Sequence, residues 1–553
     1  GFTGADHTGL YGIEATFNSV LAGEPGIKTI LTDSGSRVIE SSSRIKKEPK
    51  QGDSVVLTLD SVLQYYAESA AYEAYLRYSP KRVMVIVSDV NTNEILAMAV
   101  NPAYSLDDPW TVNADFYSSY FSEGGYDLSD QQLQMWNNPF TSFIYEPGST
   151  FKIITASSAL EENVVNLDSG FYCPGYTVVS GVQIACHVYP NSHGSENLTD
   201  AIANSCNPAL VQIANLMGST KFYNYIYNYG FGEKTGITLD GEEAGILSSN
   251  QNVNPVDFAT LSFGQGLGVT PMQMLQALNA AVNGGYLICP SIVDKIVDSN
   301  TGEEVYNYEP QVIRQVISED TSATMRGILH ETASRMSVFE EYADYGLLGK
   351  TGTAQKYMNG VYASGKYVTS FYGAVPYDDP QISVLVIMDE PGGYPVYGST
   401  TAAPVGGKVL TAAYDYLAAK DKINLSSLSA SGTVIPDVRG QNITEAVNLL
   451  NTLGIKYRLS GDENGTVTDQ DLISAEYMEG MVVQLTVSDA ENYNSVIVPN
   501  VKGMTVQKAD EVMQEVGVVM ESSGGGIAVY QDIEPGTSVE RGTVVKVKFE
   551  YIE

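Results

Sequence analysis

Three short motifs occur along the 553-residue chain in a single order, and they constrain its fold more than any other feature. They are Ser149-Thr-Phe-Lys152, Ser205-Cys-Asn207 and Lys350-Thr-Gly-Thr353. Together they supply a nucleophile, a base, a proton relay and an anion-binding strand, which acyl transfer through a serine ester requires. A fold that uses them has to bring all three to one site.

Each motif has a second copy, so its surroundings must select the functional one. Ser43-Arg-Ile-Lys46 repeats the first pattern, and Lys234-Thr-Gly236 repeats the third. Ser195-Glu-Asn197 and Ser248-Ser-Asn250 repeat the second. All four copies lie in polar or glycine-rich stretches without a following apolar period, which predicts solvated loops.

The surroundings of Ser149 favour a catalytic position. It follows Glu146-Pro-Gly148 and opens the apolar stretch FKIITASSAL, which predicts a buried helix that begins at the Pro-Gly break. The positive end of a helix favours developing negative charge, and Lys152 lies on the same face three residues later. Burial can lower the pKa of a lysine until it acts as a base. An ordinary helix cap is the alternative interpretation.

Ser205 and Asn207 precede Pro208 and the apolar stretch ALVQIANLM, which predicts a turn that enters another helix. A serine hydroxyl both donates and accepts, so Ser205 can relay a proton. The Asn207 amide can hold a backbone group of a peptide substrate. A purely structural turn remains the alternative.

The third motif lies in the stretch YGLLGKTGTAQK, and a second β-like run, YVTSFYGAVP, follows a turn region. This pattern predicts an antiparallel hairpin. Gly352 allows a ligand backbone to approach closely. Lys350, Thr351 and Thr353 can bind a carboxylate.

The motifs and their flanks resemble those of class B penicillin-binding proteins, the D,D-transpeptidases of bacterial cell-wall synthesis. The segments that carry the resemblance are in family order: VVLTLDSVLQ, YEPGSTFK, CPGY, GFGEKTGI, FGQG and GKTGTA. It implies an α+β fold, in which a helical lobe meets an antiparallel sheet as in serine β-lactamases, with the site at their junction. We assign no chemistry to the Gly264-Gln-Gly266 turn within FGQG.

The resemblance also implies residue roles. Ser149 would attack the penultimate D-alanine carbonyl of a peptidoglycan stem peptide, and Lys152 would accept its proton. Ser205 would pass a proton to the leaving group. The backbone N–H groups of Ser149 and Thr353 would form the oxyanion hole, and β-lactams would acylate Ser149 as substrate mimics. A D,D-carboxypeptidase, a β-lactamase and a β-lactam sensor or wall-binding scaffold are the alternatives.

The C-terminal third contains an internal repeat. Ile435-Pro-Asp-Val438 returns as Val498-Pro-Asn-Val501, 63 residues later. A constant offset indicates two copies of one unit. Each copy predicts a strand-like start, an amphipathic helix and alternating β segments. The unit resembles the β-α-β-β PASTA module, which favours a septal or sporulation enzyme of a Gram-positive bacterium.

We expect five segments along the chain. They are the remnant of an N-terminal pedestal or dimerisation region (1–52), a transpeptidase domain (53–422), a Ser-rich linker (423–432), and two PASTA modules (433–489 and 495–553). A formal charge of −35, from 65 acidic and 30 basic residues, argues against a nucleic-acid partner.

No run of about 18 apolar residues is present, and such a run would be needed for a transmembrane helix. The family resemblance implies a single N-terminal membrane anchor ahead of Gly1, an extracytoplasmic catalytic domain and a membrane glycosyltransferase partner. Stem peptides and β-lactams are the expected ligands.

The four cysteines and four histidines show no zinc-binding spacing, so we expect no metal and no cofactor. Cys173 and Cys186 flank a predicted hairpin and are candidates for a disulfide bond outside the cytoplasm. Cys206, inside the second motif, is expected to be a small buried residue.

Overall fold

The computed structural model contains two compact units, residues 1–109 with 136–411 and residues 110–135 with 412–553. It describes residues 1–31, 44–121, 125–249, 253–358, 360–393, 395–421, 433–453, 455–461, 465–470, 476–477, 482–488, 495–524, 526–533, 535–540 and 542–550. The predicted linker at 423–432 lies outside this part of the chain. Among the described residues, no helix has both the length and the apolar character needed to cross a membrane.

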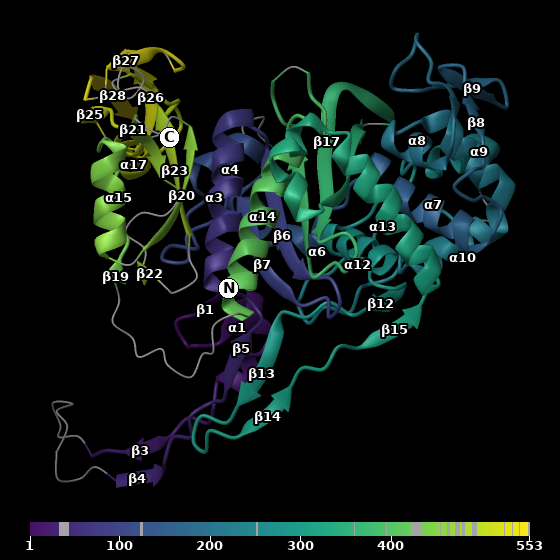
Figure 1. Ribbon diagram of the computed structural model, residues 1–553. Helices are drawn as coiled ribbons and strands as arrows, with labels where there is room; N and C mark the ends of the chain where they lie inside the picture. The colour runs from purple at the N-terminus through teal and green to yellow at the C-terminus, as the bar shows by residue number, and fades with distance from the viewer. Residues whose placement is uncertain are drawn as a thin grey trace. The chain divides into compact units, whose positions relative to one another are not determined.

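A five-stranded antiparallel sheet forms the centre of the first unit (Figure 1). Its strand order is β16-β17-β18-β6-β7. Strands β6 and β18 are buried almost throughout, as expected for central strands with long apolar runs. The five strands are β6 (Arg82–Asp89), β7 (Ile95–Asn101), β16 (Leu348–Met358), β17 (Val361–Val375) and β18 (Ile382–Asp389).

Helices cover both faces of this sheet. Neighbouring residues of β17 point to opposite faces and therefore contact different helices. The Phe371 ring packs against Gly406 of α14 (Ala402–Asp421). The next residue, Tyr372, donates a hydrogen bond to Asn279 of α12 (Pro271–Val282) at 2.9 Å. Helix α3 (Ser61–Tyr78) packs on β6 and β7.

A helical lobe packs beside the sheet and is built around α7 (Lys152–Glu161), a helix buried along most of its length. The other helices of the lobe are α8 (Leu198–Ala203), α9 (Asn207–Met217), α10 (Ser219–Asn228), α11 (Pro255–Leu261) and α13 (Glu319–Ser334). Short strands lie at its edge: β8 (Phe171–Cys173), β9 (Tyr176–Val179), β10 (Val182–Ala185) and β11 (Gly194–Glu196). The predicted α+β fold with a helical lobe against an antiparallel sheet is therefore confirmed.

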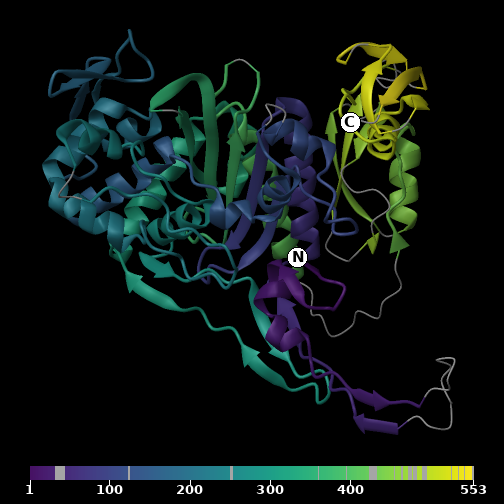
Figure 2. The same cartoon turned by 180° about the vertical axis from the view of Figure 1, so that it is seen from behind.

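The N-terminal segment joins the first unit through a three-stranded sheet in the order β14-β13-β5, drawn in purple and teal (Figure 2). Its strands are β5 (Ser54–Leu57), β13 (Val293–Val297) and β14 (Glu304–Asn307). Before it come β1 (Phe2–Thr3), β2 (Gly9–Tyr11), β3 (Ile27–Thr29) and β4 (Arg44–Lys47). Lys46 of the duplicated S-x-x-K pattern lies in β4, so that stretch is an exposed strand rather than the predicted loop.

The repeat in the second unit forms two modules of the same topology. Each has a helix and a three-stranded sheet with one parallel and one antiparallel pairing. The first contains α15 (Ile443–Thr452), β20 (Lys456–Gly461), β21 (Thr466–Gln470) and β23 (Val482–Ser488). The second contains α17 (Val506–Glu515), β25 (Val519–Gly524), β26 (Ile527–Gln531) and β28 (Val544–Glu550).

One side-chain clamp recurs in both modules and confirms that they are copies. In the first, the Gln470 amide accepts from Val438 N and donates to Pro436 O, both at 2.8 Å. In the second, Gln531 makes the same two bonds to Val501 and Pro499, both at 3.1 Å. In each module the glutamine amide accepts one backbone hydrogen bond and donates another, and the pair holds the start of the module against its sheet.

Candidate active site

The nucleophile candidate Ser149 lies in a short 3₁₀ turn, η2 (Gly148–Phe151), that leads directly into α7. Gly148 adopts a left-handed φ of 56°, and its N–H donates to Gly264 O at 3.0 Å. The Pro-Gly break therefore sets the start of the helix as predicted. Ser149 remains partly accessible, whereas Lys152 is fully buried.

Lys152 connects the first motif to the second. Its Nζ donates to Ser205 O at 2.6 Å, to Ser205 Oγ at 3.0 Å and to Asn207 Oδ1 at 2.8 Å. Burial lowers the pKa of Lys152 to about 8, although nearby Cys186, Cys206 and Glu196 oppose this shift. At neutral pH such a lysine is mostly an ammonium, with about one tenth of it present as free amine.

Ser205 and Asn207 lie where α8 turns into α9. Ser205 has a left-handed φ of 53°, an uncommon conformation for a serine, and Cys206 caps α9. The Asn207 amide donates to Ala185 O at 3.2 Å while its oxygen accepts from Lys152. The predicted turn into a helix is confirmed.

Lys350, Thr351, Gly352 and Thr353 lie on β16, which pairs with β17 to form the predicted hairpin. Lys350 is 1% exposed and donates to Thr351 O at 3.1 Å. Burial, together with the charge of Lys152, holds the pKa of Lys350 well below its usual value. Thr353 Oγ1 accepts from Gly398 N at 3.0 Å, so its own O–H stays available for a ligand.

Gly352 lets neighbouring parts of the protein approach closely. A Cβ on Gly352 would lie 2.3 Å from Ser370 Oγ and 3.0 Å from Pro147 O. A Cβ on Gly264 would lie 2.3 Å from Gly148 O. These two glycines therefore allow β16 and the Gly264 turn to pack against the nucleophile turn. Sequence reasoning gave Gly264 no role, although the Gly-Gln-Gly pattern was its visible signal.

In the described part of the chain, the duplicated motifs make local contacts of their own. Thr235 of the second K-T-G pattern is buried in a loop, where its N–H donates to Glu242 at 2.8 Å. Ser195 lies on β11, and Asn197 caps α8 with its side chain. The prediction that no helix follows this stretch is wrong, because Asn197 is itself a helix cap. Ser43 and Asn250 lie outside the described residues.

A cavity of about 610 Å³ adjoins the site, next to the end of the third motif. Its walls include Tyr145 and Glu146 before the nucleophile, Gly266, and Ala354 and Gln355 after Thr353. Glu146 accepts from Gly266 N at 3.0 Å, and burial raises the pKa of its carboxyl. The cavity therefore lies between the segment that precedes Ser149 and the end of the third motif.

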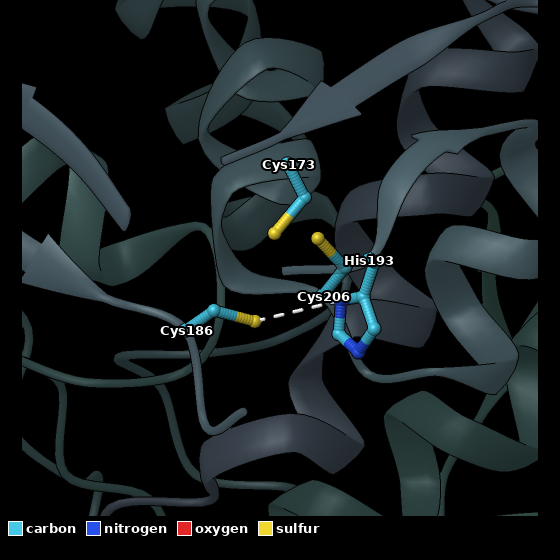
Figure 3. A group of neighbouring side chains, drawn as sticks. All are labelled: Cys173, Cys186, His193 and Cys206. Carbon is cyan, nitrogen blue, oxygen red and sulfur yellow. Dashed lines mark hydrogen bonds between the residues drawn. The ribbon is translucent and has the colours of Figure 1, made fainter. Parts of the chain in front are cut away.

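The cysteines differ from prediction. Cys173 and Cys186 are free thiols in the structure, so the bridge allowed for them is not formed. The hairpin between them, β9 with β10, is present. The side chains of Cys206 and His193 converge on the same place as these two thiols (Figure 3). Cys206 is buried, as expected.

A partly accessible serine, a buried lysine and a second lysine on a strand are groups that a serine acyltransferase uses. Family comparisons agree. Residues 83–411 match the penicillin-binding protein transpeptidase domain, residues 1–57 the penicillin-binding protein dimerisation domain, and residues 433–489 and 496–550 the PASTA domain. The chain therefore belongs to the penicillin-binding protein transpeptidase family. It is a serine-type enzyme, a peptidoglycan D,D-transpeptidase with two C-terminal PASTA domains.

Among individual relatives, the chain is 33% identical over 498 residues to "Stage V sporulation protein D" of Bacillus subtilis, covering 89% of this chain and 74% of the relative. It is 29% identical over 411 residues to "Probable peptidoglycan D,D-transpeptidase PenA" of Neisseria meningitidis serogroup A, covering 74% of this chain and 65% of the relative. These names support a role in peptidoglycan cross-linking, in division or sporulation.

Solved structures share the fold. Penicillin Binding Protein 2X from Streptococcus thermophilus superposes with a TM-score of 0.64 at 21% identity, covering 97% of this chain and 78% of that one. Penicillin binding protein 3 from Mycobacterium tuberculosis superposes with a TM-score of 0.63 at 26% identity, covering 78% of this chain and 90% of that one. Further structures of the latter are complexes with aztreonam and with ampicillin.

Proposed function

We propose that Ser149 forms the acyl-enzyme and that Lys152, Ser205, Asn207 and Lys350 are its catalytic partners. The observation that carries this proposal is the contact of Lys152 with both residues of the second motif. As an ammonium, the Lys152 Nζ atom donates all three of its protons to these two residues. Loss of one proton would free a lone pair, and the Ser205 hydroxyl at 3.0 Å could then turn from acceptor to donor.

In acylation, Ser149 Oγ attacks the carbonyl carbon of the penultimate D-alanine and its proton passes to neutral Lys152. The C–N bond to the terminal D-alanine then breaks. Lys152 returns the proton through Ser205 to the departing amine. Attack by an amine of a neighbouring stem peptide on the ester forms the cross-link and releases Ser149.

The strand groups would bind the substrate carboxylate. Thr351 and Thr353 offer hydroxyl donors, and Lys350 offers positive charge. Burial disfavours the charged form of Lys350. An arriving carboxylate would favour that form, so substrate binding and Lys350 protonation would support one another.

The oxyanion hole is proposed to comprise the backbone N–H groups of Ser149 and Thr353. The close packing of Gly352 against Pro147 O supports this, because it places β16 directly beside the nucleophile turn. Each preorganised donor of this kind stabilises the tetrahedral intermediate by roughly 3 kcal/mol.

The test is covalent labelling by a fluorescent penicillin. We expect wild type to be labelled and Ser149→Ala to be unlabelled. Ser195→Ala, in the duplicated S-x-N pattern, serves as the matched control and should be labelled like wild type. Equal labelling of Ser149→Ala and wild type would refute the nucleophile assignment.

A second assay separates transpeptidation from hydrolysis. A donor stem peptide with a labelled terminal D-alanine is incubated with an acceptor amine, and the products are separated by mass. We expect cross-linked dimer to exceed hydrolysed tetrapeptide. Hydrolysed product alone would instead establish a D,D-carboxypeptidase.

The cellular setting is also a proposal. We propose an extracytoplasmic catalytic domain over residues 53–422, anchored at the membrane and working with a membrane glycosyltransferase. The alignment with the Bacillus sporulation relative covers 89% of this chain and therefore extends beyond the transpeptidase domain, which supports a setting in division or sporulation. Co-purification of a glycosyltransferase with the membrane-anchored protein would test the partner; its absence under gentle detergent would argue against it.

A further inference from the structure

The cavity of about 610 Å³ next to the third motif has polar atoms in its wall that the proposed acylation step does not use. Glu146 Oε1 accepts from Gly266 N at 3.0 Å and from the Tyr362 hydroxyl at 3.3 Å. Its other oxygen, Oε2, is buried and has no hydrogen-bond partner among the described residues. The buried hydroxyl of Tyr145, also in the wall, has none there either. Unpaired buried polar groups are unfavourable, which indicates a site that a polar ligand completes.

The wall of this cavity adjoins the nucleophile turn. Glu146 lies three residues before Ser149, in the loop that leads into η2. Ala354, another wall residue, directly follows Thr353, and a Cβ on Gly148 would lie 3.1 Å from the Ala354 Cβ atom. We therefore expect a ligand that fills the cavity to reach an acyl group on Ser149.

The cavity opens to solvent beside the hairpin of β16 with β17. Its wall residues Tyr357 and Tyr362 are 59% and 40% exposed, and their rings meet edge to face with centroids 5.3 Å apart. Deeper in the wall, Phe143 stacks on Tyr145 at 5.9 Å. Aromatic rings pack on the alkyl chain of an amine side chain, and their faces attract cations. A second peptide strand can therefore enter the cavity from solvent.

The charged groups of the wall favour a cation over an anion. Glu146 and Asp257 contribute two carboxylates. Lys356 contributes an ammonium group, but its Nζ is already paired with Asp389 at 2.7 Å and with Glu390 at 2.8 Å. No other cation is present among the described wall residues. Burial also raises the pKa of the Glu146 carboxyl, as expected for a carboxylate without a counter-ion.

We propose that this cavity binds the acceptor stem peptide and that the Glu146 carboxylate holds the ammonium group of its nucleophilic side chain. This inference rests on the proposed function, because it concerns the second half of the same reaction. The Tyr145 hydroxyl would bind another polar group of the acceptor. The terminal carboxylate of the donor peptide is excluded from the cavity by the two carboxylates of the wall.

Glu146 would also free the lone pair that the attack needs, because a primary amine is protonated at neutral pH. Glu146 takes one proton from the bound ammonium, and the neutral nitrogen then forms a bond to the carbonyl carbon of the Ser149 ester. The C–O bond to Ser149 Oγ breaks, and Oγ receives a second proton from the nitrogen through Lys152. One N–H remains on the new amide. The Glu146 carboxyl finally loses its proton to water.

The test compares cross-linking with hydrolysis in Glu146→Gln. Glutamine keeps an oxygen that accepts from Gly266 and Tyr362 but carries no charge. The donor is a stem pentapeptide whose own side-chain amine is acetylated, and the acceptor is a stem tetrapeptide with a free side-chain amine. We expect the ratio of cross-linked to hydrolysed product to fall about tenfold, because a charge-assisted hydrogen bond is lost. The KM for the acceptor should rise, and the rate of penicillin acylation should not change.

Glu94→Gln is the matched control. Burial raises the pKa of the Glu94 carboxyl as well, but Glu94 precedes β7 and is not among the described wall residues. This variant should cross-link like wild type. A ratio of cross-linked to hydrolysed product in Glu146→Gln equal to that of wild type would overturn the proposal.

A measurement on wild type keeps the test independent of the folding of any variant. An acceptor with a dimethylated amine stays cationic but cannot form the amide, so it should compete with the normal acceptor. The acetylated acceptor is neutral and should compete about tenfold less well. Equal inhibition by the two peptides would contradict an ammonium site.

The donor peptide is the other source of an ammonium group. Donors with a free and with an acetylated side-chain amine should acylate wild type at the same rate. Faster acylation by the free-amine donor, lost in Glu146→Gln, would assign the cavity to the donor and overturn the acceptor site. Hydrolysed product alone from wild type would instead contradict the transpeptidase function, and the acceptor site with it.

Discussion

The two walls of the active site hold their groups in different ways. On the helical wall, Lys152, Ser205 and Asn207 are held by hydrogen bonds to one another. On the strand wall, Lys350 and Thr353 are held by the backbone ladder of β16 with β17. The difference teaches that the helical groups depend on each other, whereas the strand groups depend on the sheet. Removing a side chain from the helical wall should therefore disturb the other groups of that wall. Removing one from the strand wall should affect only that position.

The largest effect is expected from removing the amine on the helical wall. Lys152→Met keeps the length of the side chain but leaves Ser205 and Asn207 without their shared donor. We expect the rate of acylation by penicillin to fall about 1000-fold, within the range for loss of a general base. Stopped-flow competition with a reporter β-lactam measures this rate.

Lys234→Met, in the duplicated K-T-G loop, is the control and should acylate at the wild-type rate. A Lys152→Met rate within threefold of wild type would show that another group accepts the serine proton.

The next effect concerns the packing behind the helical wall. Gly264→Ala combines a left-handed φ of 81° with a Cβ 2.3 Å from Gly148 O. Gly302→Ala is the matched control, since its φ is 74° and no atom lies within 4 Å of the new Cβ. We expect the control to lose about 1 kcal/mol of stability and Gly264→Ala about 3 kcal/mol, measured by urea unfolding. Equal losses would mean that backbone conformation alone requires glycine there.

The pH dependence of the acylation rate should follow the protonation state of Lys152 on the helical wall. Because the pKa of Lys152 is about 8, its neutral fraction falls about tenfold for each pH unit below that value. We therefore expect the acylation rate to rise from pH 6 to 8 and to level off above it. A flat profile across this range would exclude Lys152 as the base.

The same shift affects stability. The pKa of Lys152 in the folded protein lies below the ordinary lysine value of 10.5, so the unfolded chain binds more protons between pH 8 and that value. The contribution of Lys152 to stability consequently rises with pH across this window.

Double-mutant cycles test the comparison directly and should give the smallest effect. Ser205→Ala with Asn207→Ala should be non-additive in acylation rate by about 1 kcal/mol, because both contact Lys152. Ser205→Ala with Thr353→Val spans the two walls and should be additive to within about 0.5 kcal/mol. Strong coupling across the walls would show that they act as one network.

Sequence reasoning predicted most of this site, because each motif carries a local structural signal. The Pro-Gly break before Ser149, the turn before Pro208 and the paired β runs at Lys350 each define a position on an element. The order of flanking segments then indicated the fold. The 63-residue offset indicated the second unit in the same way, as a repeat of local patterns.

What sequence reasoning missed depends on three-dimensional convergence. The convergence of Cys173, Cys186, His193 and Cys206 brings together side chains from four separate places in the chain. The role of Gly264 depends on a backbone that passes within contact distance of Gly148, more than 100 residues away. Neither relation leaves a periodic trace in the sequence.

The position of β16 has a further consequence. In the described sheet it is the outermost strand and pairs only with β17. Proteins usually protect such an edge, because its free N–H and C=O groups are a template for another chain's strand. An enzyme that recognises an extended peptide has to leave this edge open. If the edge of β16 binds an extended peptide as proposed, the same edge would expose the folded protein to unwanted strand pairing, and a bound ligand would reduce its tendency to aggregate.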